Sequence, residues 1–109
     1  MNLESHPTNQ LSGEVTCPGD KSISQRILII GSFLNCDISI SGFLDAEDPN
    51  STMMALNNLG SSIKKDNDMV SVSHRSKPLS NPSSCLDLGN SGTGMRLLTG
   101  FISGLNLVA

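Results

Sequence analysis

Two stretches of this chain share one arrangement, a glycine-containing turn leading into an aliphatic helix that carries an arginine, and they constrain the fold most. The first runs from Pro18 to Gly31. A helix beginning near Ser22 would place Lys21 and Ser22 at its N-terminus and Arg26 one turn later. Free backbone N–H groups and the helix dipole favour an anion there. The stretch predicts a phosphate or carboxylate site, with ordinary solvated surface charges as the alternative.

The second stretch, Leu88–Arg96, repeats this arrangement and strengthens the prediction of an anion site. Its glycines alternate with polar residues, including Asn90 and Thr93. Glycine lets a backbone approach a ligand closely and adopt positive φ angles. We therefore expect the turn from Asn90 to Thr93, centred on Gly92, to be a second anion-binding corner. The two corners should fold against each other and share one pocket.

Hydrophobic periodicity predicts helices and strands that alternate along the chain. Strands are expected at 11–17, 37–41 and 86–88, in a hairpin at 62–65 and 69–73, and at the apolar end near 105–109. Helices are expected at 22–34, from 48 to about 60, and at 93–105. This order predicts an α/β or α+β layered domain with helices packed on one face of a sheet.

The core should be aliphatic, because aromatic residues make up only 3% of the chain. The first helix is apolar on most sides and is expected to be largely buried, through the stripe Ile23, Ile27, Ile30 and Leu34. The second is expected to start with Asp48 as its N-cap and Pro49 as its first residue, and to end at Gly60. The third should bury Met95, Leu98, Ile102 and Leu105.

Charge and cysteine content narrow the function classes. A net charge of −3 argues against a general nucleic-acid or anionic-membrane surface, so the positive charge near Lys21 is local. The three cysteines lack metal-ligand spacing and are expected to be reduced, packed thiols in a cytoplasmic protein. An acidic cluster at Asp45, Glu47 and Asp48 could hold a metal, but carboxylates at a helix start more often complement the dipole.

No secretory or membrane signal is visible in the sequence. The last residues, 105–109, form an apolar segment, and for this reason we expect the chain to be a fragment of a longer product.

The sequence does not match the common nucleotide-binding and protease motifs. Five residues separate Gly13 from Gly19, and Asp20 intrudes before Lys21, so there is no Walker A loop. The glycines at 89, 92 and 94 have the wrong order for a dinucleotide fingerprint. Neither histidine is placed for a Ser–His–acid set.

The motifs at 18–26 and 89–97, with Glu47-Asp48 and Leu59-Gly60 between them, resemble the N-terminal part of the 5-enolpyruvylshikimate-3-phosphate synthase family. The resemblance covers the chain from Leu11 onward. It implies transfer of the enolpyruvyl group of phosphoenolpyruvate to the 5-hydroxyl of shikimate 3-phosphate, on the route to chorismate and aromatic amino acids. No metal or organic cofactor is implied, and the full-length protein would be a cytoplasmic monomer.

The same resemblance implies a fold, an inside-out α/β barrel assembled from βαβαββ units with helices inside and sheets outside. The present chain would supply the first unit and the start of the second. Residues 1–20 would contribute to the other domain, and residues 21–109 would form an incomplete first domain. The family's downstream arginines and acid/base carboxylates would lie beyond Ala109, so this segment alone should not catalyse the reaction.

Positions matching the family motif imply roles for six residues. Lys21 would be the catalytic residue and contact both substrates. Ser22 and Arg26 would hold shikimate 3-phosphate, while phosphoenolpyruvate would meet Asn90, Gly92 and Thr93. Gln25 stands where the family commonly has histidine or asparagine, a replacement expected to be tolerated. Two alternatives remain open, a transferase acting on UDP-N-acetylglucosamine and a non-catalytic phosphate-binding module.

Overall fold

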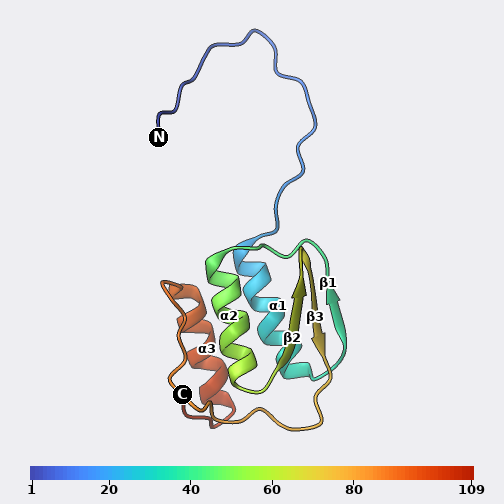
Figure 1. Ribbon diagram of the computed structural model, residues 1–109, viewed down its shortest axis with the longest axis vertical. Helices are drawn as coiled ribbons and strands as arrows, with labels where there is room; N and C mark the ends of the chain where they lie inside the picture. Colours follow the sequence, from blue (N-terminus) through green and yellow to red (C-terminus); the bar gives the residue numbers. More distant parts are fainter.

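The chain folds into a three-stranded sheet, a pair of helices that covers one face of it, and a third helix behind that pair (Figure 1). The computed structural model describes residues 1–109. In chain order the elements are α1 (Lys21–Leu34), β1 (Ile38–Ile40), α2 (Glu47–Asn58), β2 (Ser62–Asp66), β3 (Met69–Ser73) and α3 (Gly92–Gly104). The predicted α/β class is confirmed, but α3 packs on α1 and α2 and not on the sheet.

The sheet has the order β1-β3-β2, and both pairs of strands are antiparallel. Val72 of β3 lies opposite Ile38 and Ile63 at once, and these side chains face the helices. The row beside it consists of Ser39, Ser71 and Lys64, all exposed on the outer face. Alternation of apolar and polar residues along each strand therefore determines which face of the sheet is buried. The hairpin predicted at 62–65 and 69–73 is present as β2 and β3.

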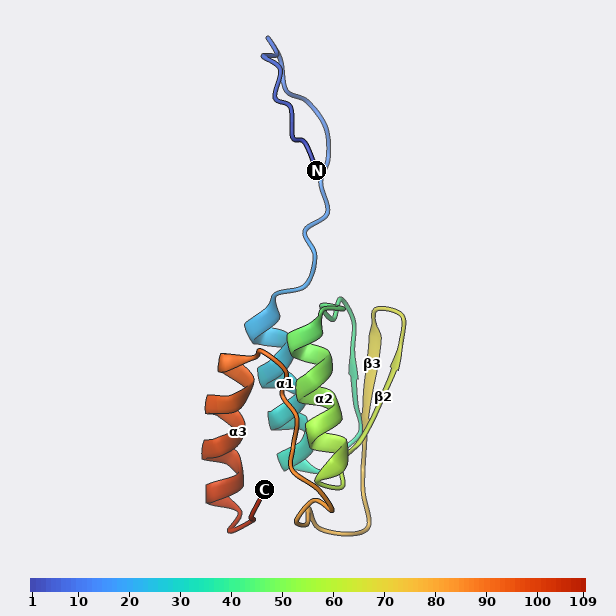
Figure 2. The same cartoon turned by 60° about the vertical axis from the view of Figure 1, so that its left-hand side comes forward.

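All three helices point the same way, so their N-termini meet at one end of the molecule (Figure 2). The first turns of α1 and α2 are joined by a hydrogen bond between Lys21 and Asp48. The second turn of α1 is joined to the N-cap of α3 by a hydrogen bond from Gln25 to Ser91. The positive ends of three helix dipoles therefore lie close together, which is the most consequential feature of the fold for function.

The buried face of α1 is not the one that the isoleucine stripe predicted. Ile23, Ile30 and Leu34 are 67%, 51% and 57% exposed. The helix instead buries Leu28 and a set of small or polar residues, Ser24, Gln25, Gly31 and Ser32. A Cβ added at Gly31 would lie 3.2 Å from Ile38 Cδ1 and 3.3 Å from Val72 Cγ2. Close approach of the helix to the sheet therefore selects the face that carries Gly31 and leaves Ile23, Ile30 and Leu34 outside.

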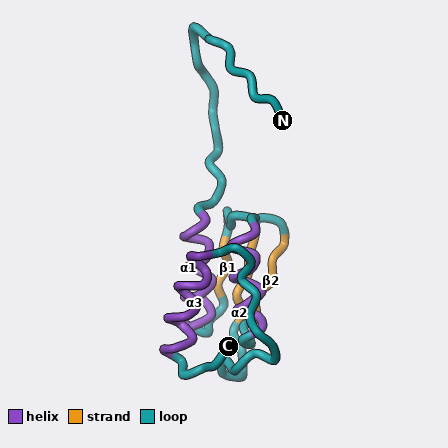
Figure 3. Tube along the Cα trace, turned by 90° about the vertical axis from the view of Figure 1, so that its left-hand side faces the viewer, coloured by secondary structure: helices purple, strands orange, loops and turns teal.

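Three predicted strands do not form. Residues 11–17 have no strand to pair with, because the chain before Thr16 extends away from the body, with Leu11 and Val15 exposed (Figure 3). Residues 86–88 cross the outside of the helices without a ladder partner, and the last residues, 106–109, are also irregular. An isolated strand leaves its backbone groups without partners in a sheet, so an alternating pattern alone does not produce one.

Helix ends and individual side chains correct further expectations. The N-cap of α2 is Ala46 and not Asp48, whose carboxylate is bonded to Lys21 instead. At the other end, Gly60 has a φ of +101° and closes the helix as predicted, one residue after the C-cap. In α3, Leu98 is buried but Met95 is 56% exposed.

The three cysteines are free and all exposed, so the prediction of packed thiols was wrong. Each helix falls short of the length and apolar character that crossing a membrane requires.

A polar strap fastens the C-terminus of α1 to the loop after β3. Asn35 has a left-handed backbone, and its side chain exchanges two hydrogen bonds with the backbone of Arg75, at 3.1 and 2.8 Å. The Arg75 guanidinium in turn donates to the Ser32 carbonyl in the last turn of the helix. A cation at this end of a helix is favourable, because the dipole places negative charge there.

We expect Arg75→Ala to lower the free energy of unfolding by about 1–2 kcal/mol, because it removes a hydrogen bond from a charged group to an otherwise unpaired carbonyl. Urea unfolding followed by circular dichroism measures the change. Lys77→Ala in the same loop is the control, since Lys77 is exposed. Equal stability of the two variants would show that the bond from the Arg75 guanidinium to Ser32 contributes nothing.

Candidate functional site

The first turn of α1 presents the first predicted anion corner. Asp20 is the N-cap, and its side chain accepts a hydrogen bond of 2.7 Å from the Ile23 backbone N–H. Lys21 and Ser22 follow in the first turn, Lys21 exposed and Ser22 half-buried. Arg26 is exposed, and its Nη1 donates back to the Ser22 carbonyl at 3.2 Å. A cation, a hydroxyl and a second cation therefore lie on one side of the helix start.

The first turn of α3 presents the second corner. Gly89 has a φ of +55°, a conformation that glycine adopts without strain, and it opens the turn that leads into the helix. Ser91 is the N-cap and accepts a 3.0 Å hydrogen bond from the Gly94 backbone N–H. The backbone N–H groups of Gly92 and Thr93 precede the first intrahelical donor. Gly92 is exposed, so these donors are available to an anion.

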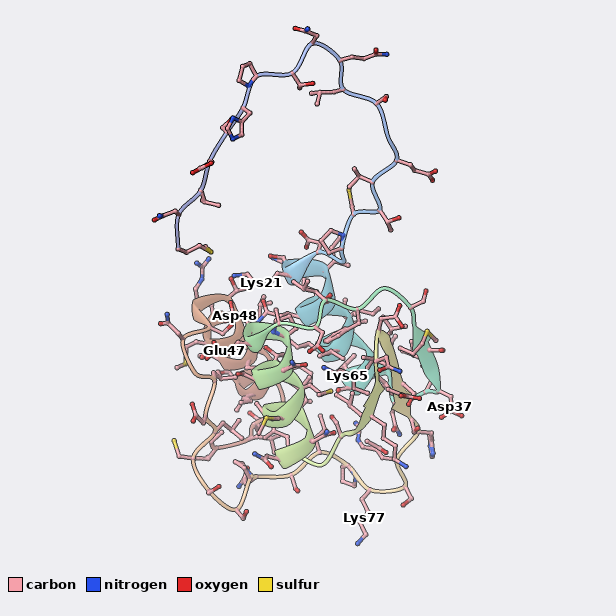
Figure 4. All side chains as sticks on the ribbon, turned by 45° about the horizontal axis from the view of Figure 1, so that its top comes forward. Lys21, Asp37, Glu47, Asp48, Lys65 and Lys77 are labelled. Carbon is pink, nitrogen blue, oxygen red and sulfur yellow. The ribbon has the colours of Figure 1, made fainter.

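The first turn of α2 lies between the two corners and carries the acidic residues. Glu47 and Asp48 both belong to this turn, as the dipole argument predicted. Lys21 Nζ donates to Asp48 Oδ2 at 2.9 Å (Figure 4), with side chains 51% and 23% exposed. An ion pair of this kind at the surface contributes about 0–1 kcal/mol to the free energy of folding. An incoming anion can therefore compete with Asp48 for the ammonium group at small cost.

Asp45 belongs to a separate polar group on the sheet side. Its carboxylate accepts hydrogen bonds from Lys65 and from Asn50 Nδ2, the latter at 2.8 Å. These bonds, first that of Lys65, hold the pKa of Asp45 below its usual value of 3.8. The ionised form thus favours the folded state, and this contribution is lost as the pH falls below 3.8 through the folded-state pKa.

We predict that the Asp45 carboxyl titrates below pH 3.8, and that Lys65→Met moves its pKa back toward that value. Carbon-detected NMR of the carboxyl group across an acid titration gives both pKa values. The remaining bond from Asn50 should keep the return incomplete. A pKa that does not move in the Lys65 variant would contradict the assignment of cause.

One buried side chain connects the corners. Gln25, one turn after Lys21, donates from Nε2 to Ser91 Oγ at 2.9 Å and to Thr52 Oγ1 at 3.0 Å. This link supports the prediction that the two corners fold against each other, but the single pocket that they were expected to share is not present. Sequence reasoning treated Gln25 only as a tolerated replacement. It gave no role to Asp20 or Thr52, although an acidic residue just before a helix start is a recognisable cap signal.

The predicted site residues gather at one end of the molecule but do not enclose a cavity. Each cavity of the chain is lined by other residues, and the largest, about 480 Å³, lies between residues 16–19 and 42–45. The site is an open surface that offers N–H donors, cations and hydroxyl groups. These groups suit the binding of an anion. Lys21 is paired with Asp48, whereas Arg26 has no acidic partner and can engage a ligand.

Comparison with known proteins decides the family. The family model described as EPSP synthase (3-phosphoshikimate 1-carboxyvinyltransferase) matches residues 5–109. The chain belongs to the EPSP synthase family. The resemblance drawn from the two glycine turns is thereby confirmed, and it extends to almost the entire chain.

Relatives within the EPSP synthase family are similar over the full extent of the chain. The 3-phosphoshikimate 1-carboxyvinyltransferase of Petrotoga mobilis is 45% identical over 108 residues, covering 97% of this chain and 25% of the relative. That of Citrifermentans bemidjiense is 42% identical over 107 residues, with the same coverages. A solved structure of EPSP synthase from Acinetobacter baumannii has a TM-score of 0.76 at 40% identity, covering 84% of this chain and 21% of that one. The chain spans about a quarter of the relatives' length.

Proposed function

We propose that the full-length polypeptide containing this chain transfers the enolpyruvyl group of phosphoenolpyruvate to the 5-hydroxyl of shikimate 3-phosphate. The bond from the enolpyruvyl carbon to the phosphate oxygen breaks, a bond to the 5-hydroxyl oxygen forms, and inorganic phosphate leaves with the hydroxyl proton. The observation that carries the proposal is the 2.9 Å link between Gln25 and Ser91. It brings a cationic helix start and a glycine-rich helix start to one end of the molecule.

In this proposal Lys21 contacts both substrates and is the catalytic residue of the segment. Ser22 and Arg26 bind shikimate 3-phosphate, while the turn containing Asn90, Gly92 and Thr93 binds phosphoenolpyruvate. Two anions repel each other, and the converging helix ends together with the cations offset that repulsion. Holding the two substrates in one orientation also removes most of the entropy loss of a bimolecular encounter.

The chain would form part of a larger two-domain protein. Residues 21–109 would belong to the first domain and residues 1–20 to the other, which agrees with an N-terminal segment that leaves the body (Figure 1). The exposed aliphatic face of α1, with Ile23 and Ile30, supports a body that is covered by further chain. The three free cysteines suit a reducing compartment such as the cytoplasm. We expect a monomer that requires neither metal nor organic cofactor.

Phosphate release tests the proposal. The full-length polypeptide, meaning this chain with the segment that follows Ala109 in its reading frame, is expected to release phosphate when given both substrates. It should not do so when UDP-N-acetylglucosamine replaces shikimate 3-phosphate, and the chain of 109 residues alone should release none. Titration with shikimate 3-phosphate and inorganic phosphate separates this function from a generic phosphate module. Equal affinity for the two ligands, with no turnover, would refute the proposal.

A further inference from the structure

Gln25 is an unusual residue for its position, because its side chain is fully buried among three helices. Its exposed fraction is 0%. Glutamine is mostly exposed in folded proteins, and a buried carboxamide is costly unless its polar atoms have partners. Here Nε2 has partners on two other helices, whereas Oε1 has none. An apolar side chain of the same shape would avoid the unpaired oxygen, so stability alone does not account for this residue.

The carboxamide fixes the two hydroxyl groups that it contacts. Thr52 donates its hydroxyl proton to the Asp48 carbonyl at 3.1 Å, so toward Gln25 it can act only as an acceptor. Ser91 Oγ accepts from Gln25 and also from the Gly94 N–H, which occupies both of its lone pairs. Each bond therefore has one allowed direction, and the group of Gln25, Thr52 and Ser91 is held in a single arrangement.

Both halves of the candidate site depend on this group. On one side, the backbone of Asp48 receives the bond from Thr52 and lies 3.4 Å from Gln25 Nε2, while its carboxylate holds Lys21. On the other side, Ser91 caps α3 and thereby orients the first turn that carries Gly92. Residues separated by 66 positions in the chain are thus joined by one amide group.

The first turn of α3 also sits unusually close to this group. A Cβ added at Gly94 would lie 2.8 Å from Ser91 Oγ, 3.0 Å from Thr52 Oγ1 and 3.3 Å from Gln25 Nε2. A side chain at residue 94 would therefore displace the Ser91 hydroxyl from its present place in the cap. The close approach shows that the position of α3 relative to α1 is tightly defined at the site end.

We propose that Gln25 is a positioning residue, whose buried carboxamide sets the distance and orientation between the turn bearing Lys21 and the turn bearing Gly92. This inference rests on the proposed function, because it concerns the relative placement of two substrates. Gln25 itself touches neither ligand, since it is buried. A shift of one turn by about 1 Å would separate the reacting groups and lower the rate, roughly 100-fold at most.

The test compares three variants of the full-length polypeptide in steady-state kinetics with both substrates. Gln25→Met keeps the shape but donates no hydrogen bond, and it should lower kcat/KM roughly 10- to 100-fold. Gln25→His retains an N–H donor and should recover most of that loss. Leu28→Val is the control for simple destabilisation, because Leu28 is equally buried on the same helix but makes no polar link. It should leave kcat/KM within about twofold at temperatures well below unfolding.

A second readout separates positioning from a loss of stability. Hydrogen exchange at the Gly94 amide should accelerate in the Gln25→Met variant and stay unchanged in Leu28→Val, since only the first disturbs the Ser91 cap. The inference is overturned if the wild-type protein is active and Gln25→Met behaves like Leu28→Val in both measurements. Failure of the wild-type protein to turn over the two substrates would overturn the proposed function itself, and the inference with it.

Discussion

Lys21→Met in the full-length polypeptide is expected to lower kcat/KM at least about 100-fold. Lys21 is the cation in the first turn of α1, where the helix dipole adds to its charge. Each hydrogen bond between a charged donor and an anion contributes about 1.5–3 kcal/mol, and Lys21 is proposed to contact two anionic substrates. A loss of about 3 kcal/mol corresponds to a rate lower by roughly 100-fold.

The same change should barely affect folding, and this separates the role of Lys21 in binding from a structural role. The Lys21–Asp48 pair lies at the surface, with side chains 51% and 23% exposed, so its removal costs at most about 1 kcal/mol of folding free energy. Lys77→Met is the matched control, since Lys77 lies at the opposite end of the molecule and points into solvent (Figure 4). Its kinetics should match those of the wild type. A Lys21→Met enzyme that retains wild-type kcat/KM would remove Lys21 from the catalytic site.

Local signals were sufficient to predict most of the elements. The helix at 22–34 and the hairpin at 62–73 follow from short-range periodicity and turn chemistry, and both are present within a residue or two. The buried face of α1 was predicted wrongly because the helix is apolar on most sides. In such a helix the choice of face depends on which side can approach the sheet, and here Gly31 decides it. That information lies in the sheet, which sequence periodicity does not describe.

The candidate site shows the same division between local and distant information. The two corners could be predicted because each is a continuous motif, with Lys21 in one and Gly92 in the other. The group that joins them could not, because Gln25, Thr52 and Ser91 are ordinary polar residues in separate parts of the chain. Their meeting is a property of three helices packed in parallel. Asp48 was misassigned as an N-cap for a related reason, since its partner Lys21 is 27 residues away.

Gly92→Ala is expected to raise the KM for phosphoenolpyruvate roughly tenfold or more while leaving the KM for shikimate 3-phosphate within about twofold. Gly92 is exposed, and a Cβ added there would meet nothing within 4 Å in this chain. The added methyl group therefore has no protein neighbour to displace, and alanine is a better helix former than glycine. A rise in the KM for phosphoenolpyruvate alone would therefore indicate contact between the methyl group and that ligand at the start of α3.

Two other glycines of α3 supply the controls that make this prediction sharp. Gly100→Ala also adds a methyl group in open space, but away from the helix start, and it should change neither KM. Gly94→Ala places a methyl group 2.8 Å from Ser91 Oγ and should lower the free energy of unfolding by about 1–3 kcal/mol, as overpacking does. Steady-state kinetics with each substrate varied, together with thermal unfolding, distinguish the three outcomes. Equal increases in both KM values for Gly92→Ala would place phosphoenolpyruvate elsewhere, because a methyl group at the α3 corner obstructs only the ligand bound there.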